Sequence, residues 1–348
     1  MDKNRFYVDF HVIQTVPPSC VNRDDTGRPK TAMYGGANRA RVSSQSWKHA
    51  IRGMFRELFS DEKLGYRTKY AADLIAGKLT ETGMDAEKAA KAAAEALKNA
   101  GLKVKDNKTG ALFFISSVQA EALAELVRNG EKDKKCYKDA LKASPSVDIA
   151  MFGRMAADDA DLNVDAASQV AHAISTHAVQ NEYDYFTAVD DCSPADNAGA
   201  GHLGTMEFNS ATLYRYATVN VQDLHSNIGT DAADAVRGFA EAFICSMPTG
   251  KQNSYANRTL PDLVYVTIRR DQPVNLSGAF EQPVTGHDGF AARSGKALFD
   301  YAEQVYADYC GDPVQSFVIG HESVLGAEKT NLNALLDALH KAIADEVI

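Results

Sequence analysis

The chain lacks the sequence features of several protein classes. Its five cysteines are scattered and contain no CxxC pair, which argues against a zinc ribbon and against a disulfide-linked scaffold. No apolar run approaches the roughly 20 residues needed to span a bilayer, and the N-terminal sequence MDKNRFYVDFHV shows no secretory signal. We therefore expect a cytoplasmic protein of about two domains without a membrane partner.

Motifs of common catalytic centres are also absent. The chain contains no HExxH, GxSxG, Walker A or SxxK pattern. His172 and His177 are close in sequence, but a spacing of five does not bring two metal ligands to one helical face. The pairs Asp24–Asp25 and Asp190–Asp191 are more typical of turns and caps than of a cation site. We expect no catalytic residue, no metal and no cofactor.

Charge is distributed unevenly. The chain has 37 basic and 46 acidic side chains, a net charge of −9, yet residues 28–52 (RPKTAMYGGANRARVSSQSWKHAIR) contain six Lys or Arg and no Asp or Glu. Eight basic and two acidic residues between positions 21 and 56 give this segment +6, which leaves −15 on the remainder. Such a segment is either a focused anion site or a solvated basic face.

The basic segment spans the start of a predicted helix. Alternating apolar residues predict a half-buried strand at 6–15, followed by a long loop at 16–39 with three prolines and three glycines. A helix then follows at 44–59, with Ser43 or Ser44 as its N-cap. One face of this helix is apolar (Trp47, Ile51, Met54, Phe55, Leu58), and the neighbouring face is polar or basic (Gln45, Lys48, Arg52, Arg56).

The rest of the chain alternates between predicted helices and strands. Residues 61–160 form a helical block, and we expect further helices at 165–179, 231–247, 294–310 and 330–347. Strands are predicted at 183–189, 207–221, 263–270 and 315–320. This pattern favours an α+β fold with a mixed sheet and helices packed on one face.

The basic segment combines the groups that bind phosphate. Its glycines allow close backbone approach, and a helix N-terminus offers free N–H groups. Ser43 and Ser44 add hydroxyls, while positive charge comes from Arg39, Arg41, Lys48 and Arg52. Because a Walker lysine is missing, a polymeric phosphate backbone suits this segment better than a mononucleotide.

Several long motifs resemble one known family. The segment FHVIQTVPPSCVNRDDTGRPKTAMYGGANRARVSSQSWKHAIR is similar to the N-terminus of the CasC-type (Cse family) backbone subunit of the type I-E Cascade complex, a CRISPR RNA-guided surveillance assembly. The motifs DIAMFGRMA, AHAISTHAV, YFTAVDD, HLGTMEFNSATLYRYATVNV and GKQNSYANRT follow in the same order. The resemblance extends from Phe6 to about Phe290.

The resemblance implies a hand-shaped subunit with three parts. Residues 1–60 and 161–348 would form an RRM-like (ferredoxin-like) palm, and residues 61–160 a helical fingers insertion. A β-hairpin thumb is expected at about 190–215. No RNP1-type aromatic octapeptide is present, so the stacking readout of an ordinary RRM is not implied.

The resemblance also implies RNA contacts at matching positions. The expected backbone contacts are Arg23, Lys30, Ser43, Gln45, Lys48 and Arg52, to which the charge of the segment adds Arg41. Met155 would wedge beside a displaced base, and Thr205 of the thumb would accompany it.

These residues predict a non-catalytic RNA-binding subunit. Copies would assemble head to tail along one CRISPR RNA beside large, small and guide-processing subunits, and present its bases to target DNA in antiviral defence. Two alternatives remain open. One is a metal-dependent ribonuclease that uses Asp190, Asp191 or Asp196, and the other is an RNA-binding module that acts alone.

Overall fold

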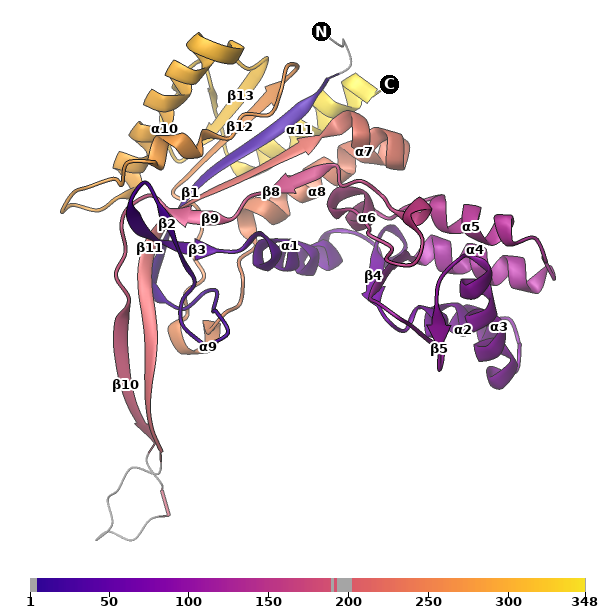
Figure 1. Cartoon of the computed structure of the whole chain (residues 1–348). Helices are drawn as coiled ribbons and strands as arrows, with labels where there is room; N and C mark the ends of the chain where they lie inside the picture. Colours follow the sequence, from indigo (N-terminus) through magenta and orange to yellow (C-terminus); the bar gives the residue numbers. More distant parts are fainter. Residues whose placement is uncertain (1–4, 189–190, 193–201, 348) are drawn as a thin grey trace.

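The fold is organised around one long central strand, β1 (Tyr7–Ser19) (Figure 1). The structure is a computed structural model and describes residues 5–188, 191–192 and 202–347. In this part of the chain, ten strands form one mainly antiparallel sheet. Its main path runs in the order β14 (Glu328–Lys329), β13 (Gln315–Ile319), β12 (Leu263–Arg269), β1, β11 (His202–Asn220), β9 (Ala173–Ser175), β3 (Ala37–Val42) and β2 (Thr31–Tyr34).

Helices cover both faces of the sheet, so the expectation of helices on one face is wrong. Residues 8–14 of β1 are all buried, as expected for a strand that is covered on both sides. Val8 and Phe10 point to one helical layer, whereas Asp9 and His11 point to the other. The alternation of apolar and polar residues in β1 therefore reflects a second face that is polar but buried, not a face in contact with solvent. The predicted α+β class is confirmed.

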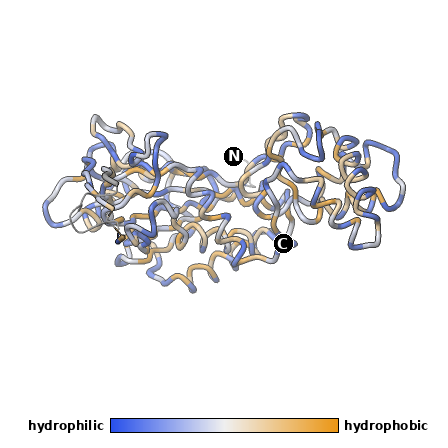
Figure 2. The backbone as a smooth tube through the Cα atoms, turned by 90° about the horizontal axis from the view of Figure 1, so that it is seen from below, coloured by the Kyte–Doolittle hydropathy of each residue, from blue (hydrophilic) through white to orange (hydrophobic). Residues whose placement is uncertain are grey.

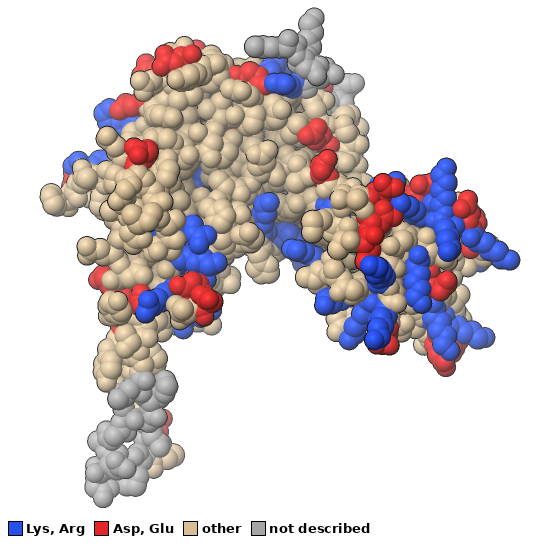
Figure 3. All heavy atoms as spheres, in the orientation of Figure 1, with Lys and Arg blue, Asp and Glu red and all other residues tan. Residues whose placement is uncertain are grey.

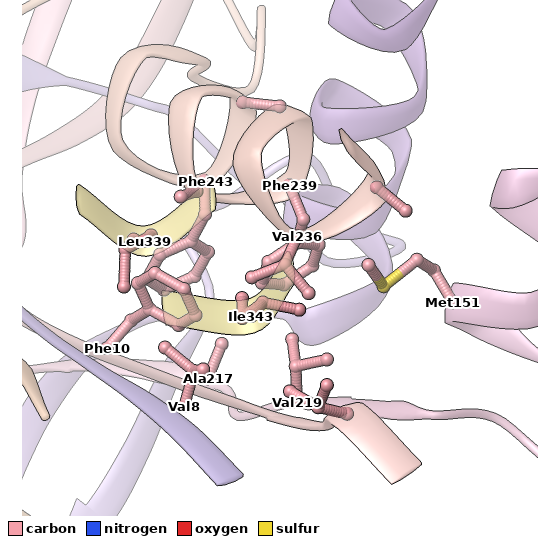
Figure 4. Packing of buried hydrophobic residues seen from close by; sticks show 14 of the residues in the cluster. Val8, Phe10, Met151, Ala217, Val219, Val236, Phe239, Phe243, Leu339 and Ile343 are labelled. Atoms are coloured by element: carbon pink, nitrogen blue, oxygen red, sulfur yellow. The ribbon is translucent and has the colours of Figure 1, made fainter. Parts of the chain in front are cut away.

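The larger core lies between the first face of the sheet and a group of helices (Figure 4). Phe10 pairs with Ala217 of β11 and with Val266 of β12, and its ring contacts Phe239 and Phe243 of α8. The helices of this layer are α1 (Ser44–Leu58), α6 (Val147–Phe152), α7 (Val221–Ile228), α8 (Ala232–Cys245) and α11 (Leu332–Val347). Burial of these apolar faces holds α1 against the sheet.

The second face carries α10 (Ala291–Val305) and a polar, aromatic core. His11 Nδ1 and the Tyr214 hydroxyl form a 2.9 Å hydrogen bond. The His11 ring lies against the rings of Tyr216 and Tyr265. Burial lowers the pKa of His11 to about 3 and raises the pKa of Asp9 to about 6. Burial therefore keeps His11 neutral at neutral pH and makes Asp9 easier to protonate than an exposed aspartate.

Residues 71–162 have a separate apolar core. Helices and short strands surround it: β4 (Gly65–Thr68), α2 (Ala71–Glu81), α3 (Ala86–Asn99), β5 (Val104–Lys105), β6 (Lys108–Thr109), β7 (Phe113–Ser116), α4 (Ser117–Arg128) and α5 (Lys134–Lys142). Figure 2 shows this part as a lobe beside the sheet, with apolar segments inside both lobes. We call residues 61–160 the fingers, although α6 near their C-terminal end packs on the sheet, and the main sheet with its other helices the palm. In the described part of the chain, no helix is long and apolar enough to cross a bilayer.

A two-stranded hairpin projects from the palm at the end opposite the fingers (Figure 1). It pairs β10 (Glu182–Ala188) with residues 202–208 of β11, and β11 then continues into the palm beside β1. The hairpin therefore starts earlier in the sequence than the expected 190–215. Most of its tip, including Asp190 and Asp196, lies outside the described residues. Asp191 is described and exposed.

The prediction of a helix at 165–179 is wrong. This segment forms β8 (Ser168–Val170) and β9, and both pair with β11. Its alanines favour a helix locally, but pairing along the edge of β11 overrides that preference. His172 and His177 therefore do not share a helical face, and no group of three or more His, Cys, Asp or Glu in the described residues is arranged to hold a metal.

Candidate nucleic-acid interface

Helix α1 begins where the basic segment meets the palm. Ser43 is its N-cap, since its hydroxyl accepts a 3.3 Å hydrogen bond from the Ser46 N–H. The Ser43 N–H donates to Asn22 Oδ1 at 2.9 Å, and the residue is buried. On the inner face of α1, Trp47 packs 3.8 Å from the buried Arg215 guanidinium. Ser43 and Trp47 thus fix the start of the helix, and its opposite face is available for contacts.

A groove of about 780 Å³ separates α1 from the fingers. Four of the predicted RNA-binding residues line it: Gln45, Lys48, Arg52 and Met155. The first three come from α1, whereas Met155 lies more than 100 positions later in the chain. Arg67 adds a further cation and Asp165 an acid, and the rings of Phe114 and Phe152 form part of the wall. Figure 3 shows lysines and arginines along the inner side of the arch between hairpin and fingers.

Lys48 is one of the cations that line this groove. Its ammonium lies 5.9 Å from the centroid of the Phe152 ring. Partial burial lowers the pKa of Lys48, and no carboxylate among the described residues lies within ion-pairing distance of it. A half-buried cation without a counter-ion gains most from an anionic ligand.

Arg52 is largely engaged within the protein. Its guanidinium donates to Asp148 Oδ2 at 3.3 Å and lies 4.5 Å from the centroid of the Phe114 ring. Asp148 in turn accepts hydrogen bonds from the Gly65 N–H at 2.9 Å and from the Ser146 hydroxyl at 2.7 Å. Arg52 therefore links α1 to the fingers, in addition to its predicted role in RNA contact.

Met155 projects from a short, firmly held loop. Its side chain is 81% exposed, whereas its neighbours Arg154 and Ala156 are 4% and 6% exposed. The Arg154 guanidinium donates to three carbonyl oxygens and to the Gln119 amide oxygen, and burial lowers its pKa to about 10. The Ala156 N–H donates to Asn163 Oδ1 at 2.7 Å. These bonds hold an apolar side chain toward solvent at the edge of a basic groove.

The remaining basic residues lie on the loop and strands before α1. Exposed Arg23 lines a second hollow, of about 740 Å³, on the other side of α1 together with Arg258. Lys30 and Arg41 are neighbours at the open end of the β2–β3 hairpin, away from its turn, where the Arg41 N–H donates to the Lys30 carbonyl at 2.9 Å. The Arg41 guanidinium donates to His172 Nδ1 at 3.1 Å, and burial, together with this positive charge, lowers the pKa of His172.

Arg39 is not part of the basic surface, which corrects the prediction that it supplies charge to the anion site. Its side chain is fully buried and donates to the carbonyl oxygens of Ser175, Phe280 and Glu281. Arg39 and Arg41 are both on β3, but only Arg41 is partly exposed. At least one arginine of the basic segment therefore stabilises the fold instead of binding an anion.

Thr205 is exposed on β11 opposite Tyr185 of β10. The hairpin and the fingers extend from opposite ends of the palm (Figure 1), so Thr205 does not meet Met155 within one chain. Sequence reasoning missed Arg67, Arg154, Arg258 and Phe114 at these surfaces. Each comes from an element distant in sequence, and no local pattern marks it.

Comparison with known proteins places the chain in a family. A model described as CT1975-like protein matches residues 8–342. A chain of a solved "CRISPR RNA-guided surveillance complex, pre-nicking" is 35% identical, with a TM-score of 0.85 over 97% of this chain and 100% of that chain. A chain of a second "CRISPR RNA-guided surveillance complex" is 31% identical, with a TM-score of 0.66 over 97% and 99%. No curated protein matches.

These matches confirm the resemblance at the level of CRISPR surveillance complex subunits, while the type I-E assignment stays a prediction. Since the family model covers nearly the whole length, the chain belongs to the CT1975-like protein family.

Proposed function

We propose that this chain is a non-catalytic backbone subunit of a type I-E Cascade complex that binds CRISPR RNA in the cytoplasm. The observation that carries the proposal is the groove beside α1, which is lined by Lys48, a cation without a counter-ion among the described residues, by the exposed Met155 and by further arginines. Similarity to chains of two CRISPR RNA-guided complexes supports the choice of RNA as the ligand.

The proposed palm is RRM-like. The order β12–β1–β11–β9 in the sheet, with α1 after β1 and α8 between β11 and β12, supports a split βαββαβ arrangement. The separate core of residues 71–162 supports a fingers insertion at about 61–160. In this proposal, the palm grips the RNA backbone and base pairing reads the target DNA.

Copies of the chain would bind head to tail along the guide. A heterologous contact of this kind generates an open filament unless it closes into a ring. Large, small and guide-processing subunits would then bind the filament within the complete assembly.

The number of bound copies should therefore increase with RNA length. Native mass spectrometry of the purified chain with single-stranded RNAs of stepwise increasing length would measure it, with DNAs of matched sequence as the comparison. A fixed dimer on every RNA would contradict the filament, and absence of RNA binding would overturn the proposal. Magnesium-dependent cleavage of a labelled target RNA that is lost in Asp196→Ala would instead favour a ribonuclease.

Lys48→Ala should flatten the salt dependence of RNA binding. For a single strand, the slope of log K against log salt is about −0.7 per neutralised phosphate, so loss of one contact per copy should reduce the slope by about 0.7 for each bound copy. Lys48 is preferable to Arg52 for this test, because Arg52 also holds Asp148. Binding titrations at several salt concentrations would measure the slope.

Two variants control for the Lys48 test. Lys48→Arg keeps the charge and should keep the slope. Lys296→Ala removes an exposed lysine of α10 that already pairs with Asp300, and should leave the slope unchanged. If Lys48→Ala behaves like Lys296→Ala, Lys48 does not contact the RNA backbone.

A further inference from the structure

The projecting hairpin has two unlike faces. Because antiparallel partners point to the same side, one face carries Tyr183, Tyr185, Thr187, Thr205 and Glu207. The opposite face carries Asp184, Phe186, Met206 and Phe208 together with Gly204. We call these the tyrosine face and the phenylalanine face.

The phenylalanine face is covered at its base by Tyr255, from another part of the chain. The Phe208 ring lies 6.1 Å from the ring of Tyr255, and the Tyr255 hydroxyl lies 3.4 Å from the Met206 sulfur. Nearer the tip, the Phe186 ring covers Gly204, where a Cβ would lie only 2.4 Å from Phe186 Cζ. The aromatic and sulfur groups on this side therefore have partners within the chain.

The tyrosine face is open. Tyr183 and Tyr185 are 69% and 65% exposed, although exposed large rings cost hydration free energy. They are two residues apart on one strand, a separation of about 6.6 Å at the usual rise per residue. Stacked nucleic-acid bases are about 3.4 Å apart, so a spacing of this size leaves room for one planar base between two rings.

The charge of the tyrosine face suits a nucleic acid. Glu207 is its only acid among the described residues, and the Glu207 carboxylate accepts hydrogen bonds from Arg28 Nε at 2.8 Å and from Asn181 Nδ2 at 3.0 Å. Arg28 belongs to the same basic loop as Arg23 and Lys30. The ion pair neutralises the acid and joins the basic loop to the base of the tyrosine face.

We propose that Tyr183 and Tyr185 form a stacking site for an unpaired nucleobase of single-stranded RNA. This inference rests on the proposed function, since it extends the RNA track from the basic loop onto the hairpin. Continuity with that loop favours RNA over a protein as the occupant. Every base has a ring face, so the site accepts any base and adds affinity without sequence preference.

The double variant Tyr183→Ala/Tyr185→Ala should weaken RNA binding by about 5- to 150-fold for each stacked base. The salt slope should stay unchanged, because no phosphate contact is removed. Tyr183→Phe/Tyr185→Phe keeps both rings and should retain affinity, which separates stacking from a folding defect. Tyr309→Ala, which removes an even more exposed tyrosine from the α10 side of the palm, is the control.

The probe is an RNA of the shortest length that binds one copy, with 2-aminopurine at successive positions. Fluorescence of a stacked position should increase in the alanine variant. Unchanged affinity and fluorescence would overturn the stacking site while RNA binding by the wild-type chain still supports the proposed function. Normal binding of the short RNA, with fewer copies on long RNAs, would mean that the tyrosines contact a neighbouring chain instead and would also overturn it.

Discussion

Asp148→Ala should lower the free energy of unfolding by about 3–5 kcal/mol, the usual cost of removing one partner of a buried ion pair. Asp148 is almost fully buried in the first turn of α6 and accepts hydrogen bonds from the Gly65 N–H, the Ser146 hydroxyl and Arg52. Alanine would leave all three donors unpaired at the joint between palm and fingers. Urea unfolding followed by fluorescence of Trp47, the single tryptophan, would measure the change.

Two further variants test whether the loss of stability comes from the lost hydrogen bonds of Asp148. Asp148→Asn keeps the size of the side chain and an acceptor oxygen, and should lose less stability than alanine. Asp300→Ala removes an exposed carboxylate that pairs with Lys296 on α10, and should change stability by no more than about 0.5 kcal/mol. If Asp148→Ala matches Asp300→Ala, Asp148 does not hold the joint.

The sequence predicts well those helices and strands in which capping residues and hydrophobic periodicity indicate the same structure. Helix α1 combines an N-cap serine with an apolar stripe, and the observed helix at Ser44–Leu58 agrees with the predicted 44–59. The segment at 165–179 lacked such a signal, since small residues there suit a helix as well as a strand. Its strands depend on β11, about 40 positions later in the chain, and pairing over this distance leaves no local pattern.

The candidate site shows the same limit. Helical spacing alone places Gln45, Lys48 and Arg52 on one face, and the groove confirms that they lie together. The approach of Met155 to this face was implied only by the family resemblance, because it depends on how the fingers pack on the palm. The sequence predicts a loop at 16–39 and with it an exposed Arg39, whereas residues 37–42 form β3 and bury this side chain.

Met155 should produce a periodic pattern of harmless mismatches in the assembled complex. In the proposed assembly, each copy inserts Met155 beside one guide base, and an apolar wedge of this kind unstacks a base at a cost of a few kcal/mol. The hydrogen bonds of Arg154 and Ala156 keep the wedge in place. A base that is displaced cannot pair, so a mismatch opposite it should cost nothing.

The experiment is a series of target DNAs with one mismatch moved along the guide, with affinity measured for each. At paired positions, loss of a stacking step of about 1.4 kcal/mol should reduce affinity by roughly tenfold, and at regular intervals the reduction should vanish. In Met155→Gly the wedge is removed, so the formerly harmless positions should acquire a penalty. Met33→Gly, at an exposed methionine of β2, should keep the wild-type pattern. A uniform penalty in the wild-type complex would show that Met155 displaces no base.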